Sequence, residues 1–260
     1  MSRVIILIGN VGSGKSLVAS KLAKKGAVVV NMDSIQEMIG GGEYGAYDYD
    51  KKEIYLSVEN TIIATALGQG FDVVVDRTNM DKKRRKRFID LAHDHGSEAV
   101  CFKAPVGNST KQLINRMKDQ RGISRETWFK VSASMISAYE EPSKDEGFSE
   151  ILEIPSKYTS YAFDFDGTIV ENKFPEIGDV FPETVAKMKK LWMRLSNLII
   201  IWTARSGNYQ CQAREFLIKN KIPFDAINYN PVFETGSRKI FAHFYYDDRA
   251  EALKNNAGRQ

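Results

Sequence analysis

The stretch Val4-Ile5-Ile6-Leu7-Ile8-Gly9-Asn10-Val11-Gly12-Ser13-Gly14-Lys15-Ser16 decides the fold of the first half of this chain. Its first five residues are all apolar and predict a short buried strand, and residues 15–25 show the apolar spacing of a helix. The eight residues between strand and helix match G-x-x-x-x-G-K-[ST], which in this context predicts a phosphate-binding loop. Without the flanking strand and helix, the same letters would indicate only a glycine-rich turn with a chance lysine.

Each residue type in this loop has a physical role. Glycines let backbone N–H groups converge on phosphate oxygens, and the start of the helix adds a favourable dipole. The lysine is expected to reach the β- and γ-phosphates of ATP, and the serine hydroxyl to bind Mg²⁺. The residues expected to bind ATP are Gly9, Gly12, Ser13, Gly14, Lys15 and Ser16.

The rest of the first half alternates strand-like apolar runs with helical patterns, which predicts an α/β domain built on a parallel sheet. The expected strands are residues 4–8, 27–31, 71–76 and 98–104, and the expected helices are residues 15–25, 49–68, 82–95, 111–119 and 125–139.

A polar segment at residues 140–147, with one proline and one glycine, breaks this pattern and is the candidate linker. The alternation then restarts, with strands expected at 158–164, 198–202, 226–228 and 244–247 and helices at 182–196 and 209–220. We therefore predict two α/β domains, residues 1–147 and 148–260, rather than one large sheet.

Composition narrows the class of protein further. The 260 residues carry 37 Lys+Arg and 33 Asp+Glu, and this formal net charge of +4 allows a nucleic-acid partner without demanding one. Two cysteines exclude a disulfide scaffold. The apolar run at the N-terminus is too short for a signal sequence or a membrane span, so we expect a cytoplasmic protein without a membrane partner. The sequence leaves the formation of homo-oligomers open.

Polar side chains follow the second and third expected strands. Asp33 comes just after residues 27–31, in the ligand crevice of an open α/β sheet, where it could accept a proton from an attacking hydroxyl. The alternative is that Asp33 caps a helix. Asp76, Thr78 and Asn79 end the third strand and are candidates for binding the acceptor, or else they build a turn. The six bases of residues 82–87 would spread over all faces of a helix, so most of them should simply be solvated, while some could contact phosphates.

Arg116 and Arg121 lie near the end of an expected helix, just before Gly122. Two arginines beside a glycine hinge fit a lid that closes over the ATP phosphates and stabilises the charge on the transferring group. Otherwise they are ordinary surface arginines.

Together, residues 9–16, Asp33, residues 76–79 and the two arginines resemble the 5′-kinase domain of the phage-type polynucleotide kinase family. The resemblance implies that Asp33 is the general base and that Lys15, Arg116 and Arg121 contact ATP. Members of this family usually carry an arginine close to the general base, whereas here its neighbours are Met32 and Ser34.

The second half resembles the haloacid-dehalogenase-like (HAD-like) phosphatases through Asp164-Phe165-Asp166-Gly167-Thr168, a D-x-D-G-T motif after an apolar strand. In this chemistry Asp164 attacks phosphorus, while Asp166 protonates the leaving oxygen and later deprotonates water. Mg²⁺ between the carboxylates and the phosphate would reduce their mutual repulsion.

The remaining motifs of that family follow in order. Thr203 ends the next strand and would bind the phosphoryl oxygen, unless it is an ordinary turn residue. Arg205 continues the family pattern and is a candidate for contacting the substrate. Lys239 matches the basic third motif, with Arg238 as its alternative. Asp247 and Asp248 would join Asp164 and Asp166 as metal ligands, unless they cap the last helix.

Only residues 169–202 separate the first two phosphatase motifs, so we expect a small Rossmann-like domain without a large cap, open to a bulky substrate end. The order kinase then phosphatase resembles the bifunctional phage-type enzyme. It implies transfer of the ATP γ-phosphate to 5′-hydroxyl ends of RNA or DNA and removal of 3′-phosphate or 2′,3′-cyclic phosphate ends. The alternative is a nucleoside or sugar kinase fused to a phosphatase of unrelated substrate.

Overall fold

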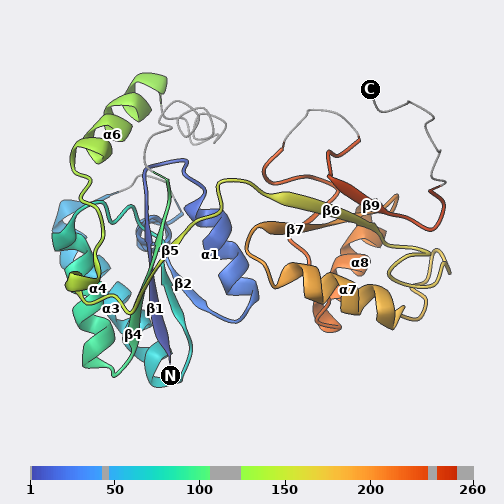
Figure 1. The fold of residues 1–260 in the computed structure, drawn as a ribbon, viewed down its shortest axis with the longest axis horizontal. Coiled ribbons are helices and arrows are strands. Elements are labelled where there is room, and N and C mark those ends of the chain that lie inside the picture. Colours follow the sequence, from blue (N-terminus) through green and yellow to red (C-terminus); the bar gives the residue numbers. More distant parts are fainter. Residues whose placement is uncertain (1, 43–46, 106–123, 234–238, 251–260) are drawn as a thin grey trace, which may run out of the picture. The chain divides into compact units, whose positions relative to one another are not determined.

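The computed structural model describes residues 2–42, 47–105, 124–233 and 239–250. The chain divides into two compact units, Met1–Ser156 and Lys157–Gln260. Each unit is built on its own parallel sheet (Figure 1). In the part of the chain that the structure describes, no helix is long and apolar enough to cross a membrane.

The sheet of the first unit has the strand order β2-β3-β1-β4-β5, and all the pairings are parallel. Its strands are β1 (Arg3–Ile8), β2 (Val28–Val30), β3 (Val73–Val75), β4 (Glu98–Lys103) and β5 (Glu150–Glu153). The helices are α1 (Lys15–Lys24), α2 (Met32–Ile39), α3 (Lys52–Gly68), α4 (Lys82–Asp94) and α6 (Arg125–Ser137), with 3-10 turns at η1 (Tyr49–Lys51) and η2 (Lys144–Glu146).

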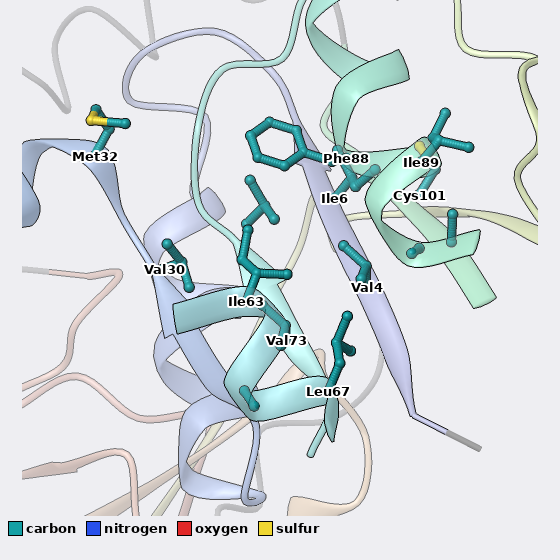
Figure 2. Packing of buried hydrophobic residues seen from close by; sticks show 14 of the residues in the cluster. Val4, Ile6, Val30, Met32, Ile63, Leu67, Val73, Phe88, Ile89 and Cys101 are labelled. Atoms are coloured by element: carbon teal, nitrogen blue, oxygen red, sulfur yellow. The ribbon is translucent and has the colours of Figure 1, made fainter. Parts of the chain in front are cut away.

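Strand β1 lies at the centre of this sheet and is buried on both faces, as expected for a parallel sheet covered by helices. Val4 and Ile6 pack against α3 and α4, through Ile63 and Phe88 among others (Figure 2). The opposite face of the sheet is covered by α1 (Figure 1). An apolar run without polar alternation therefore forms β1 because both of its faces lose contact with water.

The second unit has the strand order β8-β7-β6-β9, again entirely parallel. Its elements are β6 (Thr159–Asp164), α7 (Pro182–Trp192), β7 (Asn197–Trp202), α8 (Gly207–Lys219), β8 (Ala226–Ile227) and β9 (Phe244–Tyr246). Helices α7 and α8 cover one face of the sheet (Figure 1), where they pack on Phe163 and Ile201. The other face packs on Ile240 and Ala242.

The predicted boundary between the two domains is nine residues too early. Strand β5 follows residue 147 yet pairs with β4 in the first sheet, so the first unit continues to Ser156. Residues 140–147 are not a free linker, because buried Arg85 makes a two-pronged ion pair with Glu146, at 2.7 and 2.8 Å. The polar sequence of residues 140–147 gives no sign of this ion pair between Arg85 and Glu146.

Helix α2 has no counterpart among the predicted helices. It is only eight residues long, and it begins directly after β2 with Asn31 as its N-cap, whose side chain accepts a hydrogen bond from the Ser34 N–H at 3.1 Å. The predicted helix at 111–119 lies outside the described residues. The other predicted helices and strands that fall within them are present, with ends shifted by a few residues.

Candidate active sites

The phosphate-binding loop connects β1 to α1, as the motif predicts. Lys15 is nearly buried, and its Nζ donates hydrogen bonds to the carbonyls of Gly9 (2.8 Å) and Asn10 (2.6 Å) and to the Ser13 hydroxyl (3.2 Å). The ammonium group therefore lies inside the curve of its own loop. Gly14 precedes α1 with a φ of 90°, and Ser16 lies exposed in the first turn of the helix.

Close contacts hold this loop in shape. A Cβ atom on Gly9 would lie 2.6 Å from the Cβ of Ala104, the residue that follows β4. Only glycine therefore fits at position 9 without displacing Ala104. Asn10 is buried, and its side-chain amide donates to the Ser132 hydroxyl on α6 at 2.8 Å. Its side-chain oxygen accepts from the Val11 N–H at 2.7 Å. Helix α6 thus fixes the loop, a role for Asn10 that the motif alone does not reveal.

Asp33 lies in the first turn of α2 and is exposed. The alternative that it caps the helix is wrong, because Asn31 holds that position. Strands β2 and β3 pair in parallel with Val30 opposite Val75, so the residues after both strands lie at the same edge of the sheet. Asn31 joins the two ends by donating a hydrogen bond to the Asp76 carbonyl at 3.0 Å.

The polar residues after β3 differ in how deeply they are buried. Asn79 is buried with a φ of 46°, and its side chain donates to the Leu7 carbonyl at 2.8 Å. This side chain holds β1, which agrees with the turn interpretation, and a role for Asn79 in acceptor binding stays a prediction. Asp76 is buried beside Asn31, whereas Thr78 is half-buried and its carbonyl accepts from the Gly9 N–H.

Two arginines that sequence reasoning did not assign lie beside this edge. Glu59 on α3 is completely buried, and its carboxylate Oε2 contacts Arg77 at 3.1 Å and Arg87 at 2.9 Å. Both guanidinium side chains remain about one-third exposed, at 31% and 32%. Burial lowers the pKa of Arg77, while Glu59 opposes that shift, and Asp33 is among the charges that act on it.

One buried carboxylate shared by two arginines leaves a net positive charge on the cluster Glu59–Arg77–Arg87, and Asp33 is among the charges that act on Arg77. Arg87 belongs to the basic run 82–87, in which Arg85 is also buried rather than solvated. The signal that could have revealed the cluster is a lone acid in the apolar stripe of α3, since buried carboxylates require partners. The two expected lid arginines, Arg116 and Arg121, lie outside the described residues.

In the second unit, three carboxylates meet where the strands end. Strands β6 and β9 pair in parallel with Phe163 opposite Tyr246, which brings Asp164 level with Asp247. One carboxylate oxygen from each of Asp164, Asp247 and Asp248 lies within 4.8 Å of the others. Burial, reinforced by the other acids, raises the pKa of Asp164 to about 6, although an N–H donated by Phe165 opposes the rise.

Gly167 makes room for this cluster. It has a φ of 92°, and a Cβ atom there would lie 2.3 Å from Oδ2 of Asp248. The Asp248 N–H donates to the Thr168 hydroxyl at 3.0 Å, which holds the last carboxylate against the first motif. Three carboxylate oxygens this close together suit a hard divalent ion such as Mg²⁺.

Asp166 does not join the three carboxylates with its side chain. Its two oxygens accept hydrogen bonds from Arg205, at 2.8 Å from Nε and 2.7 Å from Nη2. Arg205 is 3% exposed and also donates to the carbonyls of Pro175 and Glu176. In this structure both Asp166 oxygens and four of the five guanidinium N–H groups of Arg205 are in these hydrogen bonds, so metal binding by Asp166 and substrate contact by Arg205 stay predictions.

Thr203 is buried after β7, and its hydroxyl oxygen accepts from the Arg205 N–H at 3.1 Å, which leaves the hydroxyl proton to donate. Asn228 fixes the Thr203 backbone from both sides, at 2.9 Å each. Lys239 is exposed with its ammonium 5.8 Å from the ring centre of Tyr245, and its role stays a prediction. Its alternative, Arg238, lies outside the described residues.

Three known proteins illustrate what this chain is similar to. Transcription factor bHLH140 from Arabidopsis thaliana is 25% identical over 150 residues, which are 57% of this chain and 15% of that much longer protein. A conserved protein of Bacteroides thetaiotaomicron with a solved structure is 33% identical, over 36% of this chain and 78% of its own, with a TM-score of 0.31. The solved Pnkp1/Rnl/Hen1 RNA repair complex contains a chain that is 17% identical, over 87% of this chain and 78% of its own, with a TM-score of 0.44.

A family model described as AAA domain matches residues 4–142. This range begins with β1 and includes the phosphate-binding loop, Asp33 and the Glu59–Arg77–Arg87 cluster. Since the match covers more than half of the 260 residues, the chain belongs to the AAA domain family, with its phosphate-binding loop in the first unit.

Proposed function

We propose that this chain is a bifunctional enzyme that repairs nucleic-acid ends, with a 5′-hydroxyl kinase in the first unit and a 3′-phosphatase in the second. The observation that carries the proposal is that each parallel sheet ends in its own set of side chains for phosphate chemistry. Lys15 and Asp33 follow β1 and β2, whereas Asp164 ends β6, and Thr203 and Asp247 follow β7 and β9.

In the kinase step, Lys15 leaves its loop carbonyls for the ATP phosphates and backbone N–H groups of residues 9–16 surround them. The 5′-hydroxyl oxygen of the acceptor attacks the γ-phosphorus, Asp33 takes its proton, and the bond to the β-phosphate oxygen breaks to release ADP. The exposure of Asp33 at the sheet edge leaves it accessible to an acceptor hydroxyl.

The Glu59–Arg77–Arg87 cluster supplies the positive charge that an acceptor phosphate requires beside Asp33. The buried carboxylate of Glu59 forms ion pairs with both arginines. Each guanidinium is therefore oriented before the acceptor binds, and little side-chain entropy is lost on binding. An acceptor with a phosphodiester next to its attacking ribose or deoxyribose would use this charge, whereas a free nucleoside would not. The cluster therefore favours oligonucleotide acceptors over nucleosides and sugars.

In the phosphatase step, a carboxylate oxygen of Asp164 attacks the phosphorus of the terminal phosphate and the bond to the leaving ribose oxygen breaks. Asp166 acts in its protonated form and donates that proton to the leaving oxygen. The carboxylate that results is stabilised by Arg205 and then accepts a proton from the water that hydrolyses the aspartyl-phosphate. Thr203 donates its hydroxyl proton to a phosphoryl oxygen. Asp164, Asp247 and Asp248 would hold Mg²⁺, which when bound supplies charge stabilisation at the phosphoryl group.

The kinase proposal is tested with radiolabelled ATP, Mg²⁺ and three acceptors: a 5′-hydroxyl oligonucleotide, a nucleoside 3′-monophosphate and the free nucleoside. We expect label on the first two and on the nucleoside only at far lower efficiency. Label on nucleosides or sugars but never on the oligonucleotide would overturn the proposal in favour of a small-molecule kinase. The phosphatase proposal is tested by release of phosphate from a 3′-phosphorylated oligonucleotide.

Two substitutions separate the activities. Lys15→Ala should abolish phosphate transfer and leave 3′-phosphate release unchanged, and Asp164→Asn should do the reverse. Lys83→Ala, an exposed lysine on α4, is the control for Lys15→Ala. If either Lys15→Ala or Asp164→Asn removes both activities while circular dichroism shows a folded protein, the assignment of two independent sites is wrong.

A further inference from the structure

Two exposed aromatic rings lie together beside the phosphatase residues. Phe174, in the segment after the first phosphatase motif, is 58% exposed, and Tyr209, in the first turn of α8, is 42% exposed. Their ring centres are 5.2 Å apart at an interplanar angle of 59°. The two rings come from different segments of the chain, so the tertiary structure creates the pair.

Arg205 contacts both this aromatic pair and Asp166, the predicted general acid. Its guanidinium carbon lies 5.2 Å from the centre of the Phe174 ring, within the range of a cation–π contact. The same guanidinium donates to both oxygens of Asp166, and its Nη1 donates to the carbonyl of Pro175, the residue after Phe174. One buried side chain therefore sets the position of the aromatic ring and of the carboxyl that would protonate the leaving group.

The surroundings argue against a general apolar docking surface. The segment that carries Phe174 also carries Glu171, Lys173 and Asp179, and Lys173 pairs with both acids. The charge of Arg205 is already matched by Asp166, so the site offers no spare cation at this point to attract a phosphate. What remains is two exposed rings within a charged rim, inclined at 59° to each other, so a planar aromatic group with polar edges can stack on the face of one ring and contact the other.

We propose that Phe174 and Tyr209 form a stacking platform for the nucleobase of the leaving group, so that the phosphatase site selects nucleotide ends over other phosphate esters. This inference rests on the proposed phosphatase activity. Base stacking on aromatic side chains is tolerant of sequence, because every base presents a π-face. The platform would therefore accept any terminal nucleotide, as an enzyme acting on ends of arbitrary sequence requires.

The test compares two substrates of the full chain with Mg²⁺: a nucleoside 3′-monophosphate and glycerol phosphate, which has no base. Phe174→Leu and Tyr209→Leu retain apolar volume but remove the stacking face. We expect each to raise KM for the nucleotide about tenfold, with kcat within about twofold and KM for glycerol phosphate unchanged. Phe174→Tyr should restore KM for the nucleotide.

Phe244→Leu is the matched control, because Phe244 is also half-exposed and stacked, on Tyr161, but lies where β9 begins rather than where it ends. Equal changes for both substrates would indicate a structural role for the rings, and no change for the nucleotide would also overturn the platform. If the wild type hydrolyses both substrates and the variants change KM for both substrates equally or for neither, the platform alone is overturned. If the wild type hydrolyses neither substrate, both the phosphatase proposal and the platform proposal are overturned.

Discussion

The guanidinium of Arg205 donates one hydrogen bond to each carboxylate oxygen of Asp166, with N–O distances of 2.8 and 2.7 Å. The arginine is 3% exposed and comes from the segment after β7, whereas Asp166 follows β6. The bidentate pair fixes the direction of a carboxyl group that would otherwise rotate freely. Because Arg205 also binds two carbonyls of the segment around Pro175, the proposed general acid and the rim of its site are positioned together.

Arg205→Lys should therefore lower phosphatase kcat by roughly two orders of magnitude, because a lysine cannot make the two parallel hydrogen bonds of the guanidinium. The kinase rate should stay unchanged. Steady-state kinetics with a 3′-phosphorylated oligonucleotide measure the effect, and Arg214→Lys on the outer face of α8 serves as the control. Normal kcat in Arg205→Lys would show that the bidentate pair does not orient Asp166 for catalysis.

Gly167→Ala should prevent the three-carboxylate cluster from forming, because the new Cβ would lie 2.3 Å from Asp248 Oδ2. Gly207 is the matched control, since its φ of 54° is also positive but a Cβ there meets no atom within 4 Å. Isothermal titration with Mg²⁺ should show loss of binding in Gly167→Ala and retained binding in Gly207→Ala. Equal Mg²⁺ affinity in both variants would contradict the placement of Asp248.

Glu59→Ala should destabilise the first unit by about 3 kcal/mol, because it leaves two arginines without their buried partner. Glu53→Ala, an exposed acid on the same helix, should change stability by less than about 0.5 kcal/mol. Urea denaturation followed by circular dichroism measures both. A small effect of Glu59→Ala would show that the arginines find other partners.

Arg77→Ala tests the acceptor side of the same cluster. Loss of this positive charge beside Asp33 should raise KM for an oligonucleotide acceptor about tenfold or more, while KM for ATP stays unchanged. The comparison with Arg3→Ala, which removes an arginine from the start of β1, controls for lost net charge. An unchanged KM for the acceptor would leave Arg77 with a purely structural role.

The raised pKa of Asp164 predicts how pH affects the metal-free second unit. Its folded-state pKa of about 6 exceeds its ordinary value of 3.8, so the fold favours the protonated carboxyl. The stability that this proton confers is fully present below about pH 4 and is lost as pH rises through 6. Asp164→Asn should therefore stabilise the metal-free protein at pH 7.5, by on the order of 1 kcal/mol after allowance for partial exposure.

Differential scanning calorimetry in EDTA, at pH 5 and pH 7.5, measures this difference. We expect Asp164→Asn to raise the Tm of the second unit at pH 7.5 and to have a smaller effect at pH 5. Saturating Mg²⁺ should stabilise the wild type at pH 7.5 more than the variant, because only the wild type keeps all three carboxylates. If Asp164→Asn is less stable than the wild type in EDTA at pH 7.5, the ionised Asp164 carboxylate does not destabilise the metal-free second unit.

Most of the architecture could be predicted from local patterns. The apolar run of β1, the glycine loop and the start of α1 follow from residues close in sequence, and so does the order in which Asp164, Thr203 and Asp247 end their strands. The failures have a common cause. Helix α2 is short and β5 has charged ends, so neither gives a strong periodic signal, and only pairing with β4 makes residues 150–153 a strand.

The sequence by itself determined that this chain has two parallel α/β units, with a phosphate-binding loop in the first and a group of aspartates at the strand ends of the second, because strand periodicity and loop motifs are local properties. Only the tertiary structure decided which polar side chains are free to act. Asn79 and Arg205 looked like substrate contacts, yet one holds β1 and the other holds Asp166. Arg77 looked incidental, yet a buried glutamate 18 residues away holds it by an ion pair, and Asp33 is among the charges that act on it. Burial forces each polar group to find a partner, and the partner is set by the fold rather than by its neighbours in sequence.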